Sequence, residues 1–362
     1  MNYLARQTEL AADLHRTKAG AMLVTHMPNV RYLCGFTGSA GVLVVFASNR
    51  AAKSVLFTDG RYTRQAGDEV QTASVVVGGK PAIIEASRAI LRWRIPVVAF
   101  EAGQMPYACY LQLKQLLGSR ARLKPVSGVV EELRMRKDPE EIEQIRGSVV
   151  LAASLFPSAL RAIRPGISEN LVAGEMELQA RRAGAEKMSF DSIVAGGKRS
   201  ALPHGRASSQ PVPDKGFIIL DWGVILAGYC SDMTRTVHVG PVSAVHRKMY
   251  HAVLDAQLAS VAAVRPGATG DQVDRAGRKV LEKAGFGAYF PHSTGHGVGL
   301  EVHEAPRLAR GQTRRLGPGM VVTIEPGIYI PDDGGVRIED MVLVTESGCE
   351  VLTPTTKDLI TL

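Results

Sequence analysis

Two pairs of acidic residues lie in segments that alternate like β-hairpins. The first pair is Asp221, which sits in an apolar run, and Asp232, which follows the next turn. A two-residue turn centred on Leu226 and Ala227 places the two aspartates directly opposite each other, and a turn at Ala227 and Gly228 places them diagonally. Either turn leaves them on one face of the sheet. Because an unpaired carboxylate in an apolar run is costly, a facing pair of aspartates requires a cation. Two acids held by arginines or backbone amides are the alternative.

The second pair, Glu325 and Glu339, flanks another turn. The two glutamates are 14 residues apart, so a regular two-residue turn would put them on opposite faces of the hairpin. A one-residue bulge would restore a common face, and Pro326-Gly327 is where we expect it. The sequence therefore predicts one carboxylate pair from each of two hairpins.

Between the two hairpins lies His296, which has a glycine on each side. The glycines allow the backbone to approach a metal ion closely. Four carboxylates and one imidazole form a hard, oxygen-rich donor set, which favours two divalent ions such as Mn²⁺, Co²⁺ or Zn²⁺ and not a zinc finger or a redox centre. Two ions about 3.5–4 Å apart can activate water and polarise a carbonyl, which is the chemistry of hydrolysis.

The chain has 362 residues, which predicts two domains. Short β-branched runs alternate with helical stretches in the first part, as in a mixed α/β domain. The strands are expected at 21–25, 41–46, 54–58, 73–77 and 97–101.

A strong helix start marks the boundary between the two domains. Asp138 is a suitable N-cap, Pro139 suits the first helical position and Glu141 completes a capping box. We place the boundary just before this helix, which gives an N-terminal domain at 1–130 and a second domain at 131–362.

The second domain contains an internal repeat. Arg-Pro-Gly occurs at 164–166 and again 101 residues later, and each copy is followed by an N-cap candidate, Ser168 or Thr269. Both units then continue as helices that end at a glycine, Gly184 or Gly285. The pattern predicts two similar α/β halves with a site between them; two unrelated Pro-Gly turns are the alternative.

Composition excludes several classes of protein. The net charge is +8, but Lys and Arg are spread along the chain without a basic segment rich in aromatic residues, so we expect no nucleic-acid partner. No apolar run is long enough to span a bilayer, and we expect no membrane association. The first residues do not have the pattern of a secretory signal, and the four cysteines are scattered, so a cytoplasmic protein with free thiols is expected.

The motifs together resemble the pita-bread metallopeptidases, and within them the aminopeptidase P and prolidase group. In the second domain the resemblance rests on five segments: 202–205 (Leu-Pro-His-Gly), 293–297 (Ser-Thr-Gly-His-Gly), 302–304 (Val-His-Glu), 324–327 (Ile-Glu-Pro-Gly) and 336–340 (Val-Arg-Ile-Glu-Asp). It extends to the first domain through the segments 29–33, 35–41 and 57–62. It implies an α/β protein with a creatinase-like N-terminal domain and a pita-bread α+β catalytic domain that has a pseudo-two-fold repeat.

The resemblance also implies a role for each site residue. Asp221 would chelate one ion, His296 and Glu325 the other, and Asp232 and Glu339 would bridge them. Two divalent metal ions, Mn²⁺ in the first place, would be the cofactors, and a proline-containing peptide would be the substrate.

Further residues are implied to act on that substrate. His204 and His303 would contact it and stabilise the tetrahedral intermediate, and Glu325 would carry the proton. His292 would lie beside the proline pocket, and Arg337 would orient Glu339 or hold a substrate carboxylate. The group commonly forms homodimers, so a homodimer is expected.

Other functions remain open at this point. A methionine aminopeptidase-like enzyme shares the five ligands but usually lacks the first domain, and a metal-free pita-bread module that binds peptides or histones would have degraded ligands. Whether the enzyme prefers Xaa-Pro dipeptides or cleaves longer Xaa-Pro peptides is not decided by the sequence. Arg31, Arg61 and Arg64 are candidates for blocking the space beyond proline.

Overall fold

A computed structural model describes residues 1–47 and 54–362. The chain divides into two compact units, Met1–Arg134 and Met135–Leu362. The division falls in the segment that precedes the predicted helix start at Asp138. There the Asp138 side chain accepts a hydrogen bond from the Glu141 amide at 2.9 Å, and the Glu141 side chain accepts one from the Asp138 amide at 3.0 Å, so the predicted capping box is present.

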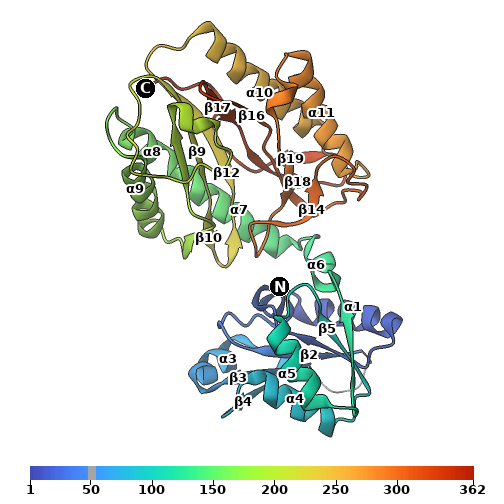
Figure 1. Ribbon diagram of the computed structural model, residues 1–362. Helices are drawn as coiled ribbons and strands as arrows, with labels where there is room; N and C mark the ends of the chain where they lie inside the picture. Colours follow the sequence, from blue (N-terminus) through green and yellow to red (C-terminus); the bar gives the residue numbers. More distant parts are fainter. Residues whose placement is uncertain (48–53) are drawn as a thin grey trace. The chain divides into compact units, whose positions relative to one another are not determined.

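The N-terminal unit is a mixed sheet with helices around it (Figure 1). Its elements are α1 (Tyr3–Thr17), β1 (Ala21–Val24), α2 (Met27–Cys34), β2 (Val42–Phe46), β3 (Ser54–Asp59), η1 (Gly60–Tyr62), α3 (Thr63–Glu69), β4 (Ala73–Gly78), α4 (Ala82–Arg92), β5 (Val97–Glu101), α5 (Tyr107–Leu117), β6 (Arg122–Val126) and α6 (Val129–Arg134). The strand order is β4-β3-β2-β1-β5-β6, with β2 antiparallel to both of its neighbours and the other pairs parallel. The five strands predicted in this part of the chain correspond to β1 to β5. The central strands β1 and β2 are buried along their whole length, which is why they consist of apolar residues.

The second unit begins with helices and continues as several small antiparallel sheets. Its helices are α7 (Pro139–Ser154), α8 (Phe156–Ala162), α9 (Glu169–Arg182), η2 (Gly197–Ala201), α10 (Ala244–Ala263), α11 (Gly270–Lys283) and η3 (Gly287–Tyr289). Its strands are β7 (Lys187–Met188), β8 (Ile193–Gly196), β9 (Gly216–Trp222), β10 (Val224–Leu226), β11 (Tyr229–Cys230), β12 (Met233–Val239), β13 (Gly295–Gly297), β14 (Glu304–Leu308), β15 (Val321–Ile324), β16 (Gly327–Ile330), β17 (Gly334–Arg337), β18 (Asp340–Val344) and β19 (Cys349–Val351).

Helices cover the strands of this unit from two sides. Figure 1 shows β9, β12 and β16 to β18 between α8 and α9 on one side and α10 and α11 on the other. One core cluster joins α7, α8 and α9 to β9 and β12, where the Trp222 indole stacks on Phe156 with ring centroids 5.8 Å apart. A second cluster joins α10 and α11 to β16 and β17. Strands covered on both faces carry few exposed side chains, so any polar residue on them needs an internal partner.

The predicted repeat is present as a matched set of hydrogen bonds. The amide of Gly166 donates to the Val212 carbonyl and the amide of Gly267 donates to the Leu316 carbonyl, each at 2.9 Å. In turn, the Val212 amide donates to the Ile167 carbonyl and the Leu316 amide donates to the Ala268 carbonyl, each at 2.7 Å. The N-caps of α9 and α11 are the predicted Ser168 and Thr269, and both helices end before a glycine with positive φ. The two halves of this unit therefore begin in the same way, and the interpretation as unrelated turns is wrong.

The first hairpin has the second of the two predicted registers. Leu226 pairs with Tyr229, so the turn lies at Ala227-Gly228, and both turn residues have positive φ. Asp221 consequently pairs with Thr234, two residues beyond Asp232. The direct pairing of Asp221 with Asp232 is wrong, and the diagonal arrangement is confirmed.

In the second hairpin Glu325 and Glu339 lie on one face of the sheet, but the predicted bulge is not the cause. Ile330 pairs with Gly334, which leaves a three-residue loop that contains Asp332 in the left-handed region. The register of β16 with β17 is the same as that of β15 with β18, so Glu325 and Glu339 lie opposite each other. The bulge expected at Pro326-Gly327 is wrong, because the extra residue is in the loop and not in the strand.

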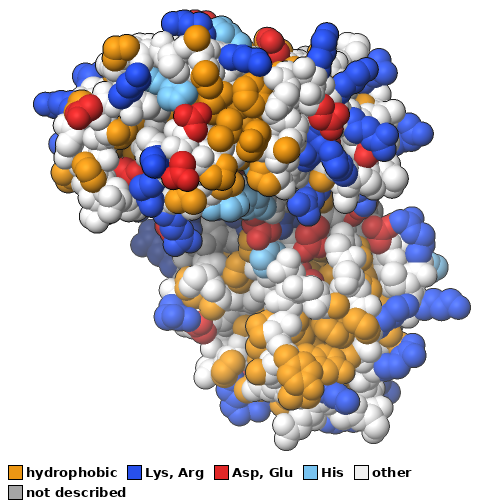
Figure 2. All heavy atoms as spheres, turned by 45° about the horizontal axis from the view of Figure 1, so that its top comes forward, with side chains coloured by type: hydrophobic (Ala, Val, Ile, Leu, Met, Phe, Trp, Pro, Cys, Tyr) orange, Lys and Arg blue, Asp and Glu red, His pale blue; other side chains and the backbone are white. Residues whose placement is uncertain are grey.

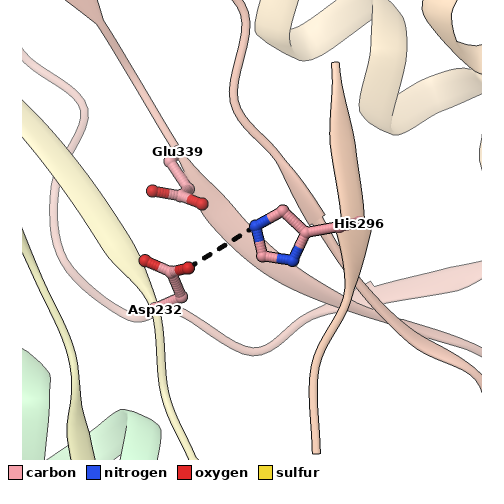
Figure 3. Close-up of side chains that lie close together, drawn as sticks. All are labelled: Asp232, His296 and Glu339. Atoms are coloured by element: carbon pink, nitrogen blue, oxygen red, sulfur yellow. Dashed lines mark ion pairs between the residues drawn. The ribbon is translucent and has the colours of Figure 1, made fainter. Parts of the chain in front are cut away.

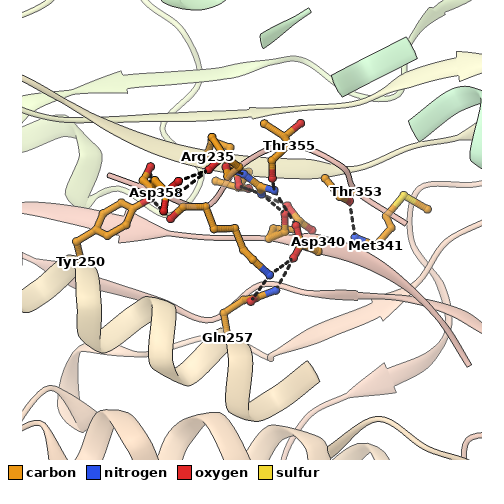
Figure 4. Close-up of polar contacts among 12 residues, drawn as sticks. Arg235, Tyr250, Gln257, Asp340, Met341, Thr353, Thr355 and Asp358 are labelled. Atoms are coloured by element: carbon orange, nitrogen blue, oxygen red, sulfur yellow. Dashed lines mark hydrogen bonds and ion pairs between the residues drawn. The ribbon is translucent and has the colours of Figure 1, made fainter. Parts of the chain in front are cut away.

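A buried polar network joins β12 and β18 to the segment at 353–358 (Figure 4). The Asp340 carboxylate is fully buried and accepts from Arg235, Gln257 and Lys357, each at 2.8 Å. Arg235 also donates to the carbonyls of Thr355 and of Glu339. Because each charge in this network has several partners, the charges can be buried at a tolerable cost.

Charged side chains are distributed over the surface. Figure 2 shows Lys and Arg around both units on the face in view, interspersed with acidic and uncharged side chains. Among residues 1–47 and 54–362, no helix combines the length and the apolar composition that a membrane crossing requires.

Candidate metal centre and active site

Three of the predicted ligands form a tight cluster of donor atoms. Asp232, His296 and Glu339 each offer one atom, and these atoms lie within 4.8 Å of one another (Figure 3). Asp232 directly precedes β12, His296 is the centre of β13 and Glu339 directly precedes β18. The Asp232 Oδ2 to His296 Nε2 distance is 3.7 Å. Three different strands therefore bring the donors together.

The other two predicted ligands adjoin this cluster. Glu325 follows β15 and places its Oε1 3.4 Å from the His296 Nε2 atom. Asp221 lies on β9, diagonal to Asp232. All five predicted ligands line one cavity of about 660 Å³ in the second unit. The structure thus brings together the whole set that sequence reasoning selected.

The glycines around His296 are required by close packing. A Cβ atom at Gly295 would overlap the Thr323 carbonyl, and one at Gly297 would overlap the Ala305 carbonyl. The register of β13 with β14 shifts between the two glycines, which turns the His296 side chain towards the carboxylates. Its Nδ1 lies 3.0 Å from the Gly297 carbonyl, so Nδ1 carries the proton and donates to that oxygen. This tautomer leaves the Nε2 lone pair free to bind a metal ion.

Burial and mutual repulsion disfavour the ionised forms of the predicted carboxylate ligands, and a bound cation would offset both effects. Burial, and then the charges of Glu339 and Asp221, hold the pKa of Asp232 well above its usual range. Burial, and then the charges of Glu325 and Asp221, do the same for the pKa of Glu339. Burial raises the pKa of Glu325 to about 7, and the charge of Asp221 adds to this. Like charges at short range disfavour ionisation, and a divalent ion reverses that effect.

An unsatisfied acceptor points to the same conclusion. The Oδ1 atom of Asp221 is buried and has no hydrogen-bond partner among the described residues. A buried carboxylate oxygen without a donor costs free energy, so a ligand is expected there. The residues present therefore fit divalent metal ions.

Arg337 is the basic residue that enters this cluster. Its guanidinium donates to Asp221 Oδ2 at 2.6 Å and to the Thr234 hydroxyl at 3.1 Å, and Thr234 in turn donates to Glu339 at 2.7 Å. Arg337 therefore holds Asp221, but no arginine or backbone amide of the described residues donates to the Asp232 carboxylate, so the alternative in which such groups hold both aspartates does not account for this site. Arg337 therefore orients two of the predicted ligands.

His292 is connected to Arg337 through a tyrosine that the sequence did not single out. The Arg337 guanidinium donates to the Tyr329 hydroxyl at 2.6 Å, and that hydroxyl lies 2.9 Å from His292 Nε2. Nδ1 of His292 lies 2.8 Å from the Ser293 carbonyl and donates to it, so Nε2 accepts from Tyr329. Burial, followed by the charge of Arg337, lowers the pKa of His292 to about 4, so His292 is neutral at physiological pH.

The walls of the cavity carry residues that are more exposed than the ligands. His204, His303, Arg206 and Arg307 all line it and are exposed. The His303 ring lies beside that of His296, with centroids 4.3 Å apart. Burial, followed by the neighbouring His296, lowers the pKa of His303. A neutral imidazole at position 303 can donate one hydrogen bond and accept another.

Arg307 was missed by sequence reasoning, and it differs from the other arginines of the cavity. Arg337 is bound to Asp221, and Arg206 lies 3.2 Å from Asp191. No carboxylate of the described residues lies within ion-pair distance of Arg307. The sequence signal that indicates Arg307 is its spacing, since it lies four positions after His303 on the strand that directly follows that histidine.

Comparisons with known proteins agree with this geometry. Residues 143–346 match the model of metallopeptidase family M24, and residues 6–136 match the creatinase/prolidase N-terminal domain. The chain belongs to metallopeptidase family M24. It is a two-domain metallo-exopeptidase, and the creatinase-like domain and pita-bread catalytic domain expected from the motifs are confirmed.

Relatives of this metallopeptidase include enzymes of both kinds considered above. The Xaa-Pro dipeptidase of Pyrococcus furiosus is 44% identical over 71% of this chain and 74% of its own length. The structure of an Xaa-Pro dipeptidase from Bacillus anthracis has a TM-score of 0.95 at 40% identity and covers all of both chains. An X-Pro aminopeptidase from Thermotoga maritima has a TM-score of 0.89 at 32% identity, over 97% of this chain and 100% of its own. Like other members of its family, this metallopeptidase uses divalent metal ions.

Proposed function

We propose that this metallopeptidase hydrolyses the peptide bond before proline and that its preferred substrates are Xaa-Pro dipeptides. The relatives named above act on Xaa-Pro bonds, which supports the bond specificity. The dipeptide preference rests on one observation: Arg307 has no ion-pair partner among the described residues, and it lines the same cavity as the four carboxylates of the predicted metal site. A dipeptide differs from a longer peptide in having its free carboxylate directly after proline, within reach of the same cavity.

An arginine suits the recognition of that carboxylate. Its planar guanidinium can donate two parallel hydrogen bonds to a carboxylate. Arg337 already donates to Tyr329, Asp221 and Thr234, so its capacity is largely used within the protein. Arg307 is free to bind the substrate, and Arg337 then acts by orienting Asp221 and, through Thr234, Glu339.

The proposed ligand set is the one that the sequence predicted. Asp221 would bind one ion, His296 and Glu325 the other, and Asp232 and Glu339 would bridge them. Mn²⁺ is the proposed metal, since a set of four carboxylates and one imidazole suits a hard divalent cation. When bound, the two ions supply Lewis-acid activation of the scissile carbonyl and of water.

The residues of the chain perform the remaining steps. Glu325 is partly open to the cavity, and its Oε atoms would hold the proton taken from water and pass it to the departing proline nitrogen. His204 and His303, which line the cavity, would donate hydrogen bonds to the oxygen that becomes negative in the tetrahedral intermediate. His292 would fix the proline ring, because it is neutral and held in place by Tyr329.

A comparison of four substrates tests the proposal. Ala-Pro, Ala-Pro-amide, Ala-Pro-Ala and Ala-Ala would be assayed with the Mn²⁺-loaded wild type and with Arg307→Met. We expect Ala-Pro to exceed the amide and the tripeptide at least about tenfold in kcat/KM, since a charge-assisted hydrogen bond contributes about 1.5–3 kcal/mol. Arg307→Met should remove that difference by reducing turnover of Ala-Pro alone.

Two results would contradict different parts of the proposal. Equal turnover of Ala-Pro and its amide would refute the dipeptide preference and leave Xaa-Pro cleavage in place. Equal turnover of Ala-Ala would refute the specificity for proline. Arg247→Met, which changes an exposed arginine on α10, is the matched control and should leave all four rates unchanged.

The remaining proposals concern the protein as a whole. We propose that 1–130 form the creatinase-like domain and 131–362 the catalytic domain; the division of the chain into two compact units after Arg134 supports a boundary in this region. A homodimer and a cytoplasmic location complete the proposal, and the four free cysteines are compatible with a reducing compartment.

A further inference from the structure

Each half of the catalytic unit has a buried carboxylate on the helix that follows the repeated Arg-Pro-Gly, α9 or α11. Each of these carboxylates accepts hydrogen bonds from a loop of the active site. Glu169 is the first residue of α9 and Asp274 lies in the second turn of α11, and both are 0% exposed. Neither is a predicted metal ligand, and neither lines the cavity. Each accepts hydrogen bonds from residues of a loop outside its helix, and the helix itself does not require these bonds. The loops that they hold carry different parts of the active site.

Glu169 holds the loop that contains His204. Its carboxylate accepts the amide of Gly196 at 2.9 Å, the Arg199 Nε–H at 3.1 Å and the Ser208 hydroxyl at 2.6 Å. Arg199 extends the contact by donating to the Arg206 carbonyl at 2.8 Å. His204 therefore lies between attachment points on both sides in the sequence.

Asp274 holds the loop that leads to His296. Its carboxylate accepts the Thr294 hydroxyl at 2.8 Å and the Thr294 amide at 3.2 Å, and it pairs with Arg278 at 2.6 Å. Arg278 donates to the carbonyls of Phe290 and His292. Thr294 lies two positions before His296, so Asp274 fixes the approach of that ligand.

Thr294 connects the same carboxylate to a second ligand. The Thr294 carbonyl accepts the amide of Glu325 at 2.8 Å. A shift of Thr294 would therefore move both His296 and Glu325, which bind the same ion in the proposed ligand set. The loop held by Glu169 contains no proposed ligand.

We propose that Glu169 and Asp274 are positioning residues with separate tasks: Glu169 places His204 against the substrate, and Asp274 places His296 and Glu325 for metal binding. This inference rests on the proposed function. It predicts that the loss of one carboxylate affects turnover and the loss of the other affects metal affinity. A merely structural role would lower the thermal stability of both variants without this separation.

The test uses Glu169→Gln and Asp274→Asn in the full-length protein. Calorimetric titration of the apoproteins with Mn²⁺ gives the metal Kd, and assays of Ala-Pro at saturating Mn²⁺ give kcat and KM. We expect Glu169→Gln to keep the metal Kd within about twofold and to lose about 10- to 100-fold in kcat. Asp274→Asn should weaken Mn²⁺ binding by about 10- to 100-fold, and excess Mn²⁺ should restore most of its kcat.

Milder variants and matched controls complete the design. If a carboxylate variant does not fold, Ser208→Ala and Thr294→Val remove the hydroxyl that each carboxylate accepts and should show the same separation with a smaller effect. Glu177→Gln on α9 and Glu282→Gln on α11 change exposed residues of the same helices and should behave as the wild type.

The outcomes separate this inference from the proposed function. Variants with the metal Kd and kcat of the wild type, or a weakened metal Kd in Glu169→Gln with an unchanged one in Asp274→Asn, would overturn it. A wild type that binds no Mn²⁺ and does not cleave Ala-Pro would instead refute the proposed function.

Discussion

Replacing Glu325 with glutamine removes one negative charge from the carboxylate cluster. In the metal-free protein, burial raises the pKa of Glu325 from 4.5 to about 7. The folded state therefore binds more protons than the unfolded state between these two values. The contribution of Glu325 to the stability of the metal-free protein therefore falls as pH rises through this window, at about 1.4 kcal/mol per pH unit.

The size of the effect follows from the width of the window. About 2.5 pH units correspond to roughly 3 kcal/mol of stability that is present at pH 4.5 and lost above pH 7. Glutamine does not titrate, so Glu325→Gln should be close to the wild type near pH 5 and more stable by up to about 3 kcal/mol at pH 8. The charge of Glu325 also raises the pKa of Glu339, so its removal relieves a neighbour as well.

The assay is thermal unfolding of the metal-free proteins by calorimetry between pH 5 and pH 8. Mn²⁺ should reverse the order, because the wild type offers the additional ligand and gains more from binding. Glu346→Gln, which changes an exposed glutamate of the same unit, should follow the wild type at every pH. A metal-free Glu325→Gln that is less stable at pH 8, or a difference that does not change with pH, would refute this reasoning.

Three further predictions concern the metal centre and the assembly. Asp232→Asn should lose metal and activity together, whereas His303→Ala should keep its metal and lose about 10²–10³-fold in kcat; the opposite pattern in metal analysis would show that the ligand set is wrong. Exhaustive chelation should abolish Ala-Pro cleavage, and Mn²⁺ or Co²⁺ should restore it; full activity with no metal by elemental analysis would contradict the two-metal proposal. Light scattering at assay concentration should give the mass of a homodimer, and a fully active monomer would count against it.

The residues of the metal centre could be predicted because their chemistry departs from their surroundings. Asp221 stands out in an apolar strand, and His296 stands between two glycines. The strands of the N-terminal unit could be predicted for the complementary reason, since buried β-branched runs between Gly and Pro have few other interpretations. In both cases the signal is local in the sequence.

Register was harder to predict because it depends on loop length. The turn after β10 has neither Asn-Gly nor Asp-Gly, so two registers fitted the sequence equally well. In the second hairpin the sequence Pro-Asp-Asp-Gly-Gly allows several loop lengths, and the left-handed conformation of Asp332 selects three residues. We predicted a bulge at Pro326-Gly327, but the three-residue loop supplies the extra residue instead.

Contacts between distant segments could not be predicted. Tyr329 lies between His292 and Arg337, and Asp274 reaches Thr294, but nothing in the spacing of these residues indicates the contact. Such contacts exist because the strands of several small sheets converge, and one sequence without the fold does not contain that information.

The network around Asp340 has a consequence for protein engineering. Arg235, Gln257 and Lys357 are far apart in the sequence, but they share one buried carboxylate next to Glu339. Their substitutions should therefore be strongly non-additive, since the first one leaves Asp340 with too few donors and later ones cost less. A scan of single positions would rank all of them as indispensable. Simultaneous replacement of the four by an apolar set of equal volume is the experiment that could retain the fold, because it leaves no charge unpaired.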